Sequence, residues 1–398
     1  MEDQSRFLAW KKNAQHIYTT LLVYELPWPS VTVQWMPELI SNGAKREQRI
    51  VLATNTGGQD ANYLRIAELT TPEALPLQLG DFDFESETVG GFSPQLACDL
   101  RIVQRITVSG TVYQARIMPA NCNLVAIVSS TGESALLDLT KFPYQPVADY
   151  VPTISFVPAD RNSTNAIMDE IKSEVVTSYQ SVCCSWSPVN EGLLAIGNSR
   201  GEVSIYDIKT EYDHKKSSMA PINTITVDRE ISDIQFHPRR PGTLAFVSEN
   251  LKLYVYQLSQ GEPSLIIEHS CSSAPSALAW NPANDSLMVV GLSSGDLVLF
   301  DLRHEAVEIY SFKGHDDMVT SIDWNTHHPS IFVSASADRT TKIWDATKFE
   351  NKPLFVHAGH QAPVTDVHWN PARPAMLASV AEDNSLHVYE PASDIIGF

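Results

Sequence analysis

The chain has 398 residues, of which 43% are hydrophobic, and 28 Lys and Arg against 47 Asp and Glu give it a net charge of −19 at pH 7. This apolar content is enough for a folded core, which excludes a disordered acidic tail. The acidic balance argues against a nucleic-acid binder and against docking on anionic lipid, and it favours a basic partner.

The first predicted element is an amphipathic helix in an N-terminal domain, residues 1–27. Its apolar residues recur at intervals of three and four, which places them on one face of a helix. This stripe consists of Phe7, Trp10, Ala14, Ile17 and Leu21. Pro27 ends the helix, and the stripe is expected to pack on the side of the main domain. Leu8, Tyr18 and Leu22 widen the stripe, and they either secure the helix or leave a groove open for another helix.

The second predicted element is a strand over residues 30–36, where apolar and polar residues alternate. It lies directly before a series of repeats that are expected to form a ring of sheets. Such a ring has to be closed, because an open ring leaves an unpaired edge strand. We therefore predict that residues 30–36 close the ring by pairing with the last repeat.

The repeats are segments in which alternating strands are separated by Pro/Asn turns and polar turns. Five clear copies are 182–209, 231–259, 275–303, 319–347 and 364–392, with equivalent aromatic residues Trp186, Phe236, Trp280, Trp324 and Trp369. Weaker copies cover residues 112–140 and 49–69. A period of 44 to 50 residues with this pattern is typical of WD-type blades. We predict an all-β fold, a seven-bladed WD40 β-propeller over residues 28–392 with the N-terminal α-helix packed on its side.

Two connections between the predicted blades are unusual. The first, residues 80–92, is acidic without the spacing of an EF-hand loop, so it is either a solvated loop or a patch for a basic partner. Its carboxylates are Asp81, Asp83, Glu85 and Glu87. The second is the insertion 141–180, which is longer than ordinary loops and is either mobile or a docking element.

Several His and Asp residues of the last two blades resemble catalytic residues when they are considered alone. In WD-repeat proteins, which the repeats resemble, a His, an Asp, a Trp and a strand hydroxyl form a buried hydrogen-bond network. The matching residues are His315, Asp338, Trp344 and either Ser334 or Ser336 in blade 6, and His360, Asp383 and Tyr389 in blade 7. We interpret them as structural, because a buried imidazole needs partners for both nitrogens.

No catalytic residue, no metal site and no cofactor are predicted. The sequence lacks HExxH, GxSxG, P-loop and GxGxxG motifs. Four histidines are close in sequence, but strand alternation is expected to place them in different strands and loops, which disfavours a metal site. They are His357, His360, His368 and His387. The protein is therefore expected to bind partners without catalysing a reaction.

Several longer motifs along the chain indicate one family more specifically than the repeats do. They include Trp10-Lys11-Lys12-Asn13, Trp28-Pro29-Ser30-Val31-Thr32-Val33-Gln34-Trp35-Met36-Pro37, Ala115-Arg116-Ile117-Met118-Pro119 and His357-Ala358-Gly359-His360. They resemble the retinoblastoma-binding histone-chaperone family of WD-repeat proteins, over nearly the whole chain. The short loop after blade 6 and the ending HVYEPASDIIG are most similar to the fungal small subunit of chromatin assembly factor 1 within that family.

The resemblance implies a groove that holds the first helix of histone H4. Its walls are the N-terminal helix, the loop between blades 6 and 7, and the C-terminal tail, residues 393–398. The residues at these positions are His16, Ile17, Thr20, Leu21, Phe349, Glu350, Asp394, Ile395 and Ile396. An amphipathic helix would bury its apolar face on the aliphatic residues, while carboxylates bind its Lys and Arg residues.

The chain departs from the family in two places. The loop between blades 6 and 7, residues 346–353, is short and keeps one carboxylate, Glu350. Family members also hold histone H3-type tails in an acidic top channel, and here only Glu382 persists, next to Asp383. The other ring positions are Thr111, Gln180, Ser232 and Met318. The first departure makes that wall of the groove shorter and less negative, and the second weakens the expectation of a peptide site at Glu382 and Asp383.

The resemblance implies a non-catalytic subunit that binds histones H3 and H4 in a chromatin assembly complex such as chromatin assembly factor 1. Its partners are then the two histones and the larger subunits of that complex, with no direct nucleic-acid contact and no membrane. The expected location is the nucleus, with the cytoplasm second, and the propeller is expected to be monomeric within the hetero-complex. The alternative is an adaptor of a deacetylase, polycomb, acetyltransferase or ubiquitin-ligase complex, without direct histone binding.

Overall fold

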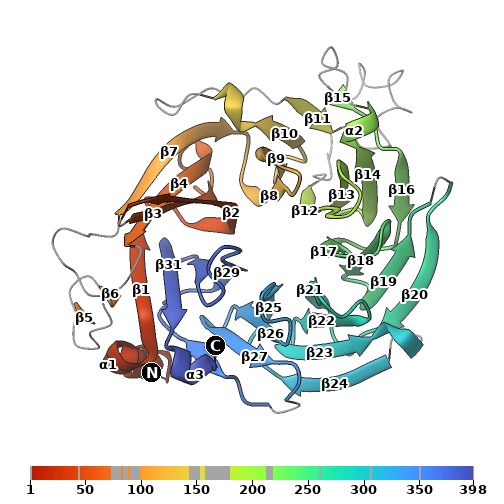
Figure 1. Cartoon of the computed structure of the whole chain (residues 1–398). Helices are drawn as coiled ribbons and strands as arrows, with labels where there is room; N and C mark the ends of the chain where they lie inside the picture. Colours follow the sequence, from red (N-terminus) through yellow and green to blue (C-terminus); the bar gives the residue numbers. More distant parts are fainter. Residues whose placement is uncertain are drawn as a thin grey trace.

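In the computed structural model, seven sheets are arranged in a ring (Figure 1). The described residues are 2–43, 45–72, 82–83, 88–89, 99–142, 153–156, 180–211, 218–259, 261–304, 307–348 and 351–397. Most of the acidic connection 80–92 and of the insertion 141–180 lies outside these ranges. The ring confirms the predicted seven-bladed β-propeller.

The first three blades are antiparallel sheets of four main strands each. Blade 1 consists of β2 (Ser30–Asn42), β3 (Lys45–Thr54), β4 (Asn62–Pro72) and β7 (Asp99–Val108). Blade 2 consists of β8 (Val112–Met118), β9 (Asn121–Ser129), β10 (Ser134–Asp138) and β11 (Ile154–Phe156), and β15 (Ser218–Met219) pairs in parallel with β11. Blade 3 consists of β12 (Ser181–Trp186), β13 (Leu193–Asn198), β14 (Glu202–Asp207) and β16 (Asn223–Thr226).

The next three blades are built from consecutive strands. Blade 4 consists of β17 (Ile231–Phe236), β18 (Thr243–Ser248), β19 (Lys252–Gln257) and β20 (Ser264–Ser270). Blade 5 consists of β21 (Pro275–Trp280), β22 (Leu287–Leu292), β23 (Asp296–Asp301) and β24 (Val307–Lys313). Blade 6 consists of β25 (Val319–Trp324), β26 (Ile331–Ser336), β27 (Thr341–Asp345) and β28 (Phe355–His357).

Blade 7 combines strands from both ends of the chain. It consists of β29 (Val364–Trp369), β30 (Leu377–Ala381), β31 (Ser385–Pro391) and β1 (Tyr18–Glu25), and β6 (Thr88–Val89) and β5 (Phe82–Asp83) extend it. The helices are α1 (Glu2–Ile17), α2 (Ile208–Glu211), α3 (Ser393–Ile396) and the 3-10 turns η1 (Leu139–Lys141) and η3 (Leu302–His304). Within the described part of the chain, no helix is both long and apolar enough to cross a membrane.

The recurring tryptophan of the repeats joins blades 3, 5, 6 and 7 to the blade before each of them. Four indole N–H groups donate to backbone carbonyl oxygens of the preceding inner strand at 2.9–3.3 Å. These are the indoles of Trp186, Trp280, Trp324 and Trp369. The indole therefore fills the space between two sheets and also pairs a carbonyl group that would otherwise be buried without a donor.

The ring is closed by β1, the strand that directly follows the N-terminal helix. β1 pairs antiparallel with β31, and Leu21 lies opposite Tyr389. The prediction that residues 30–36 close the ring is wrong, because these residues begin β2, the innermost strand of blade 1. Both segments have strand-like sequences, and local alternation does not specify the pairing partner of a strand.

The N-terminal helix is shorter than predicted. α1 ends at Ile17 and β1 begins at the next residue, although the helix was expected to extend to residue 27. Leu21 and Leu22 are both buried, because they point to opposite faces of β1. Leu21 lies in the core with α1 and blade 6, and Leu22 lies in the core with blade 1. The β-branched Thr and Val residues of this segment favour a strand over a helix.

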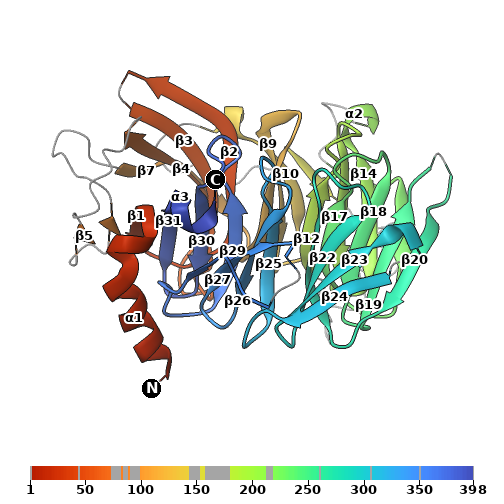
Figure 2. The same cartoon turned by 60° about the horizontal axis from the view of Figure 1, so that its bottom comes forward.

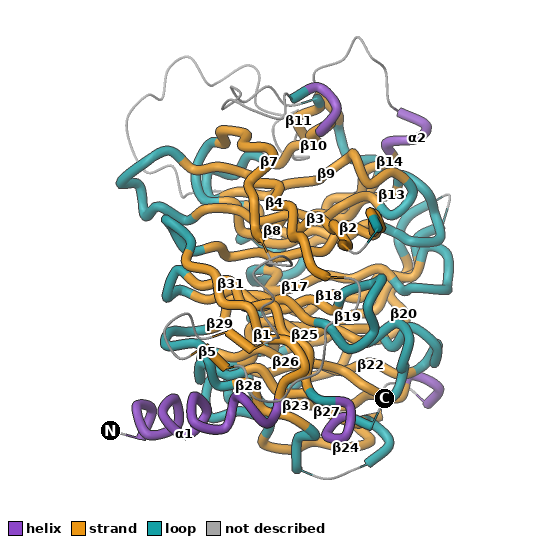
Figure 3. The backbone as a smooth tube through the Cα atoms, turned by 60° about the vertical axis from the view of Figure 1, so that its left-hand side comes forward, coloured by secondary structure: helices purple, strands orange, loops and turns teal. Residues whose placement is uncertain are grey.

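α1 packs on the side of the ring against blades 6 and 7, as predicted (Figure 2, Figure 3). The indole of Trp10 lies in a buried core with Phe355 of β28 and Tyr389 of β31. Gly359 allows the indole of Trp10 to lie close to the backbone at that position, because an added Cβ atom would be only 2.7 Å from Cζ2 of Trp10. The C-terminal residues are also docked, since Ile396 of α3 is buried in the same core.

Candidate functional site

Segments near the two ends of the chain lie side by side in blade 7, where β1 pairs with β31 (Figure 1). The backbone N–H of Ala392 donates to the carbonyl oxygen of Ile17 at 3.0 Å, which joins the start of α3 to the end of α1. Ile17 and Ile395 are half-buried and pack on the same apolar core. We call this surface, formed by His16, Ile17 and α3, the α1–α3 edge.

Four residues of the predicted groove lie at the surface of the α1–α3 edge. His16 and Asp394 are exposed, whereas Ile17 and Ile395 are half-buried. Asp394 lies in the first turn of α3, where a carboxylate also interacts favourably with the helix dipole. The edge therefore offers a partner two aliphatic side chains together with a carboxylate and an imidazole.

Three other residues of the predicted groove are buried and cannot contact a partner. Thr20 is 1% exposed, Leu21 0% and Ile396 5%. The prediction is wrong for Thr20 and Leu21 because it continued the helix into the segment that forms β1. It is wrong for Ile396 because that side chain is buried in the core on which the α1–α3 edge packs. Phe349 and Glu350, which were predicted to form the loop wall, lie outside the described residues.

A buried chain of hydrogen bonds holds α1 against blade 7. The indole N–H of Trp10 donates to the hydroxyl oxygen of Tyr18 at 2.7 Å, and that hydroxyl donates to Nδ1 of His357 at 2.5 Å. His357 then carries its proton on Nε2 and donates to Nδ1 of His387 at 2.9 Å. Burial lowers the pKa of His357 and of His387 well below the usual range, so both rings are neutral.

Three of the four histidines that are close in sequence are also close in space. One ring nitrogen each of His357, His360 and His387 lies within 4.8 Å of the others. The three residues belong to different strands and a loop, as predicted, but this placement does not keep them apart. Hydroxyl groups of Ser385 and Ser379 occupy both nitrogens of His360, at 2.8 and 2.7 Å.

The arrangement of these three rings is unsuited to a shared metal ion. The ring of His360 stacks on that of His387 with centroids 3.9 Å apart and an interplanar angle of 19°. A metal bound through an imidazole nitrogen lies in the plane of the ring, and the planes of two stacked rings do not meet at bonding distance. We therefore assign the cluster to the hydrogen-bond network that supports α1 and blade 7.

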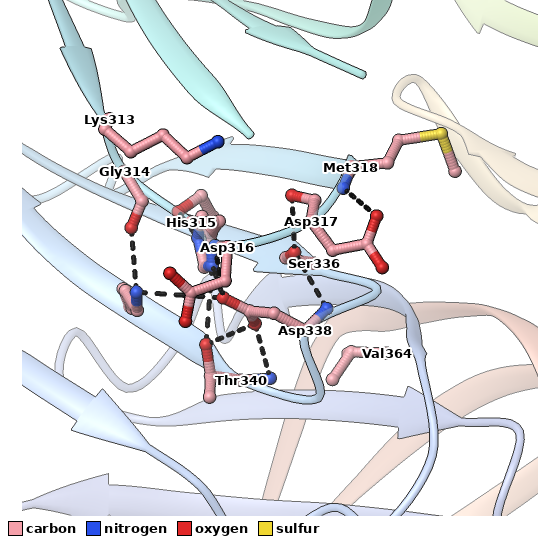
Figure 4. Close-up of polar contacts among 12 residues, drawn as sticks. Lys313, Gly314, His315, Asp316, Asp317, Met318, Ser336, Asp338, Thr340 and Val364 are labelled. Carbon is pink, nitrogen blue, oxygen red and sulfur yellow. Dashed lines mark hydrogen bonds and ion pairs between the residues drawn. The ribbon is translucent and has the colours of Figure 1, made fainter. Parts of the chain in front are cut away.

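In blade 6, hydrogen bonds join the three residues that the repeats single out, and Figure 4 shows two of them, His315 and Asp338, beside each other. His315 donates from Nδ1 to Asp338 at 2.9 Å and accepts at Nε2 from the Ser334 hydroxyl at 2.7 Å. The same Ser334 oxygen accepts the indole N–H of Trp344 at 2.8 Å. Burial raises the pKa of Asp338, but the hydrogen bonds from His315 and Thr340 and the charge of Lys342 outweigh it and hold this pKa well below its usual range.

The two residues of the predicted top-channel site have different environments. Glu382 is exposed. Asp383 is committed to its own loop, since its carboxylate accepts the backbone N–H groups of Gln361 at 2.6 Å and of Ser385 at 3.1 Å. Only Glu382 of this pair therefore offers an uncommitted carboxylate to a basic peptide.

A cavity of about 330 Å³ lies inside the ring and is lined by the innermost strands. Arg116 and Asp366 form an ion pair there at 3.3 Å, and burial raises the pKa of Asp233 to about 6. Three carboxylates accept backbone N–H groups of the next blade at 2.8–3.0 Å, namely Asp233 from Leu278, Asp323 from Trp369 and Asp366 from Val33. These residues, which sequence reasoning missed, join the blades. Their signal was an aspartate in the inner strand of three of the repeats.

Two family models match the chain. One is described as histone-binding protein RBBP4 or a component of the CAF1 complex and matches residues 5–73, from α1 to β4 of blade 1. The other is a β-propeller model, described as the N-terminal domain of nucleolar protein 10-like proteins. It matches residues 165–391, more than half of the chain. The first model thus covers α1 and the closing strand, and the second covers blades 3 to 7.

Curated fungal proteins named histone acetyltransferase type B subunit 2 are similar to this chain. That of Candida glabrata is 24% identical over 84% of this chain and 73% of the relative. Those of Debaryomyces hansenii and Mycosarcoma maydis are 24% and 30% identical, over 87% and 63% of this chain and 77% and 57% of the relatives. The chain belongs to the WD-repeat β-propellers and, within them, to the histone-binding family of RBBP4-like proteins.

Proposed function

We propose that this protein is a non-catalytic nuclear subunit that binds histones H3 and H4 for a chromatin assembly complex, and that it captures the first helix of histone H4 at the α1–α3 edge. The observation that carries the proposal is the position of Ile17 and Ile395. Both are half-buried on one core, at the edge of a helix that a seven-bladed ring does not need for closure.

The chemistry of the α1–α3 edge suits an amphipathic basic helix. Complete burial of an isoleucine side chain is worth about 1.5–3 kcal/mol, and the part of each side chain that is still exposed remains available to a partner. The carboxylate of Asp394 can form an ion pair with a Lys or Arg side chain of that helix. The net charge of −19 attracts strongly basic histones over a longer range and raises the rate of encounter.

The complex that the protein serves has two candidates. The description of the N-terminal family model includes a component of the CAF1 complex, which supports chromatin assembly. The names of the curated relatives favour a second candidate, a type B histone acetyltransferase complex. Affinity purification from cells separates the two. Large assembly-factor subunits support the first candidate, and an acetyltransferase catalytic subunit supports the second.

The binding site is tested by capture of recombinant H3–H4. We expect Ile17→Asp and Ile395→Asp to weaken capture at least tenfold, because each places a charge in the apolar contact. Leu8→Asp is the matched control, since Leu8 is 60% exposed and its distance of nine residues from Ile17 places it on the opposite face of α1. Capture at wild-type level by both edge variants contradicts the site, and no capture by the wild type supports an adaptor without direct histone binding.

A further inference from the structure

Blade 1 contains two pairs of arginines whose surroundings differ. Arg49 of β3 and Arg101 of β7 lie on either side of Glu68 of β4, and both form ion pairs with it, at 3.3 and 2.6 Å. The second pair consists of Arg65 of β4 and Arg105 of β7, which lie directly opposite each other. It is three positions along β4 from Glu68, toward the start of that strand. Only the first pair has a carboxylate between its members.

The second pair has no anionic partner in the described part of the chain. Among the residues that the structure describes, neither Arg65 nor Arg105 forms an ion pair or a side-chain hydrogen bond, and Nε of Arg65 is buried without an acceptor. Arg65 is nevertheless only 5% exposed. Both guanidinium groups lie over the ring of Tyr63, at 6.0 Å for Arg65 and 5.4 Å for Arg105.

Strand alternation places the three side chains on one face of blade 1. Leu64 and Ile66 of β4 pack in the core with blade 2, whereas Ala67 and Leu69 pack in the core with blade 7. Odd-numbered residues of β4 therefore face blade 7, and Tyr63 and Arg65 are among them. The pair lies between the outer strands of blades 1 and 7, whereas the α1–α3 edge lies where blade 7 meets blade 6.

This arrangement is unfavourable unless an anion is present. Like charges directly opposite each other in an antiparallel pair destabilise a sheet, and a buried cation without a partner loses its hydration. Burial and the neighbouring charge of Arg105 accordingly lower the pKa of Arg65. The cation–π contacts with Tyr63 hold the two groups in place but neutralise neither charge.

We infer that Arg65, Arg105 and Tyr63 form a binding site for an oxyanion, a carboxylate or a phosphate, that is held between the two guanidinium groups. A guanidinium group presents two parallel N–H donors that match the oxygens of either anion, and stacking on an aromatic ring orients these donors. The oxyanion can belong to free phosphate or to an acidic side chain of a partner peptide. The two sources share this chemistry and are separated by experiment.

The first experiment measures thermal unfolding and calorimetric binding with inorganic phosphate, against sodium chloride at equal ionic strength. Chloride and a control variant are needed because phosphate also stabilises proteins non-specifically. We expect phosphate to raise the melting temperature of the wild type and of the control Arg101→Met beyond the chloride value. Arg65→Met and Arg105→Met should lack this increment and bind phosphate at least tenfold more weakly. Without phosphate, Arg65→Met should be at least as stable as the wild type, because it removes a buried unpaired charge.

The second experiment measures the fluorescence anisotropy of a labelled Glu-rich peptide with the same four proteins. Peptide binding that is lost in Arg65→Met and Arg105→Met, and that phosphate competes away, identifies a carboxylate side chain as a ligand. Binding of phosphate without the peptide identifies the free anion. Equal phosphate increments in all four proteins, or no binding of either probe to the wild type, overturn the inference.

Discussion

Blades 6 and 7 have the same four-strand plan but differ in where their strands and polar contacts come from. Blade 6 is built from residues 319–357, and the partners of His315 lie within 25 residues of it. Blade 7 takes its fourth strand from residues 18–25, and its network reaches Trp10 of α1 through Tyr18 and His357. Ring closure thus replaces local contacts with contacts between the two ends of the chain.

The aromatic residue at the end of the third strand shows the same contrast. In blade 6 the indole of Trp344 donates to Ser334 of its own blade. In blade 7 the equivalent Tyr389 shares a hydrogen bond with Thr341 of blade 6 at 2.5 Å, and its ring stacks on His357 at 4.2 Å. The polar contacts of blade 7 therefore link it to α1 and to β27 of blade 6, whereas those of Trp344 stay within blade 6.

The largest expected effect comes from the closing strand. Leu21→Ala removes a fully buried side chain that packs on both α1 and blade 6, and we expect it to lower the free energy of unfolding by about 2–5 kcal/mol. The matched control is Leu8→Ala on α1, which is 60% exposed and should change stability by less than about 0.5 kcal/mol. Urea unfolding measures both, and equal effects would contradict the role of β1 in closure.

A smaller effect is expected from the glycines that precede the two blade histidines. A Cβ atom at Gly359 would lie 2.7 Å from the rigid indole of Trp10, whereas one at Gly314 would lie 2.6 Å from the end of the flexible Leu297 side chain. Gly359→Ala should therefore cost about 1–3 kcal/mol and change the fluorescence of Trp10, and Gly314→Ala should cost less. Equal losses of stability in the two variants would contradict the tighter packing that we assign to Gly359 beside Trp10.

A pH-dependent effect is expected from acid, and it is small close to pH 6.5. The pKa values of His357 and His387 are lowered in the folded state, so below the unfolded value of about 6.5 the unfolded chain binds protons that the folded chain does not. Stability is complete above that pH and falls as pH decreases, by up to about 1.4 kcal/mol per pH unit for each histidine.

This pH dependence can be assigned to blade 7 with two variants. His387→Gln should reduce the slope of unfolding free energy against pH between 6.5 and 5, since the amide keeps an acceptor for His357 without titrating. His16→Gln removes an exposed imidazole and serves as the control. A slope that His387→Gln leaves unchanged would place the acid sensitivity elsewhere in the molecule.

The candidate site could be predicted only in part. His16, Ile17, Asp394 and Ile395 do lie at one edge, and the family motifs suggested these positions. Thr20, Leu21 and Ile396 were assigned to the surface, but they are buried. Leu21 fits both a helical stripe that begins at Phe7 and an alternating strand, so its spacing alone did not decide between the two.

The sequence by itself determined the number of blades, because a repeated pattern of strands, turns and aromatic residues is a local property of each copy. It also determined that an apolar helix packs on the ring, since the stripe from Phe7 to Ile17 needs a core. Only the tertiary structure decided that residues 18–25 close blade 7, that three distant histidines lie close together, and that Arg65 and Arg105 face each other with no carboxylate of the described residues bound to either. These features depend on pairing between segments that are far apart in the chain, and a strand's own side-chain pattern does not specify its neighbour.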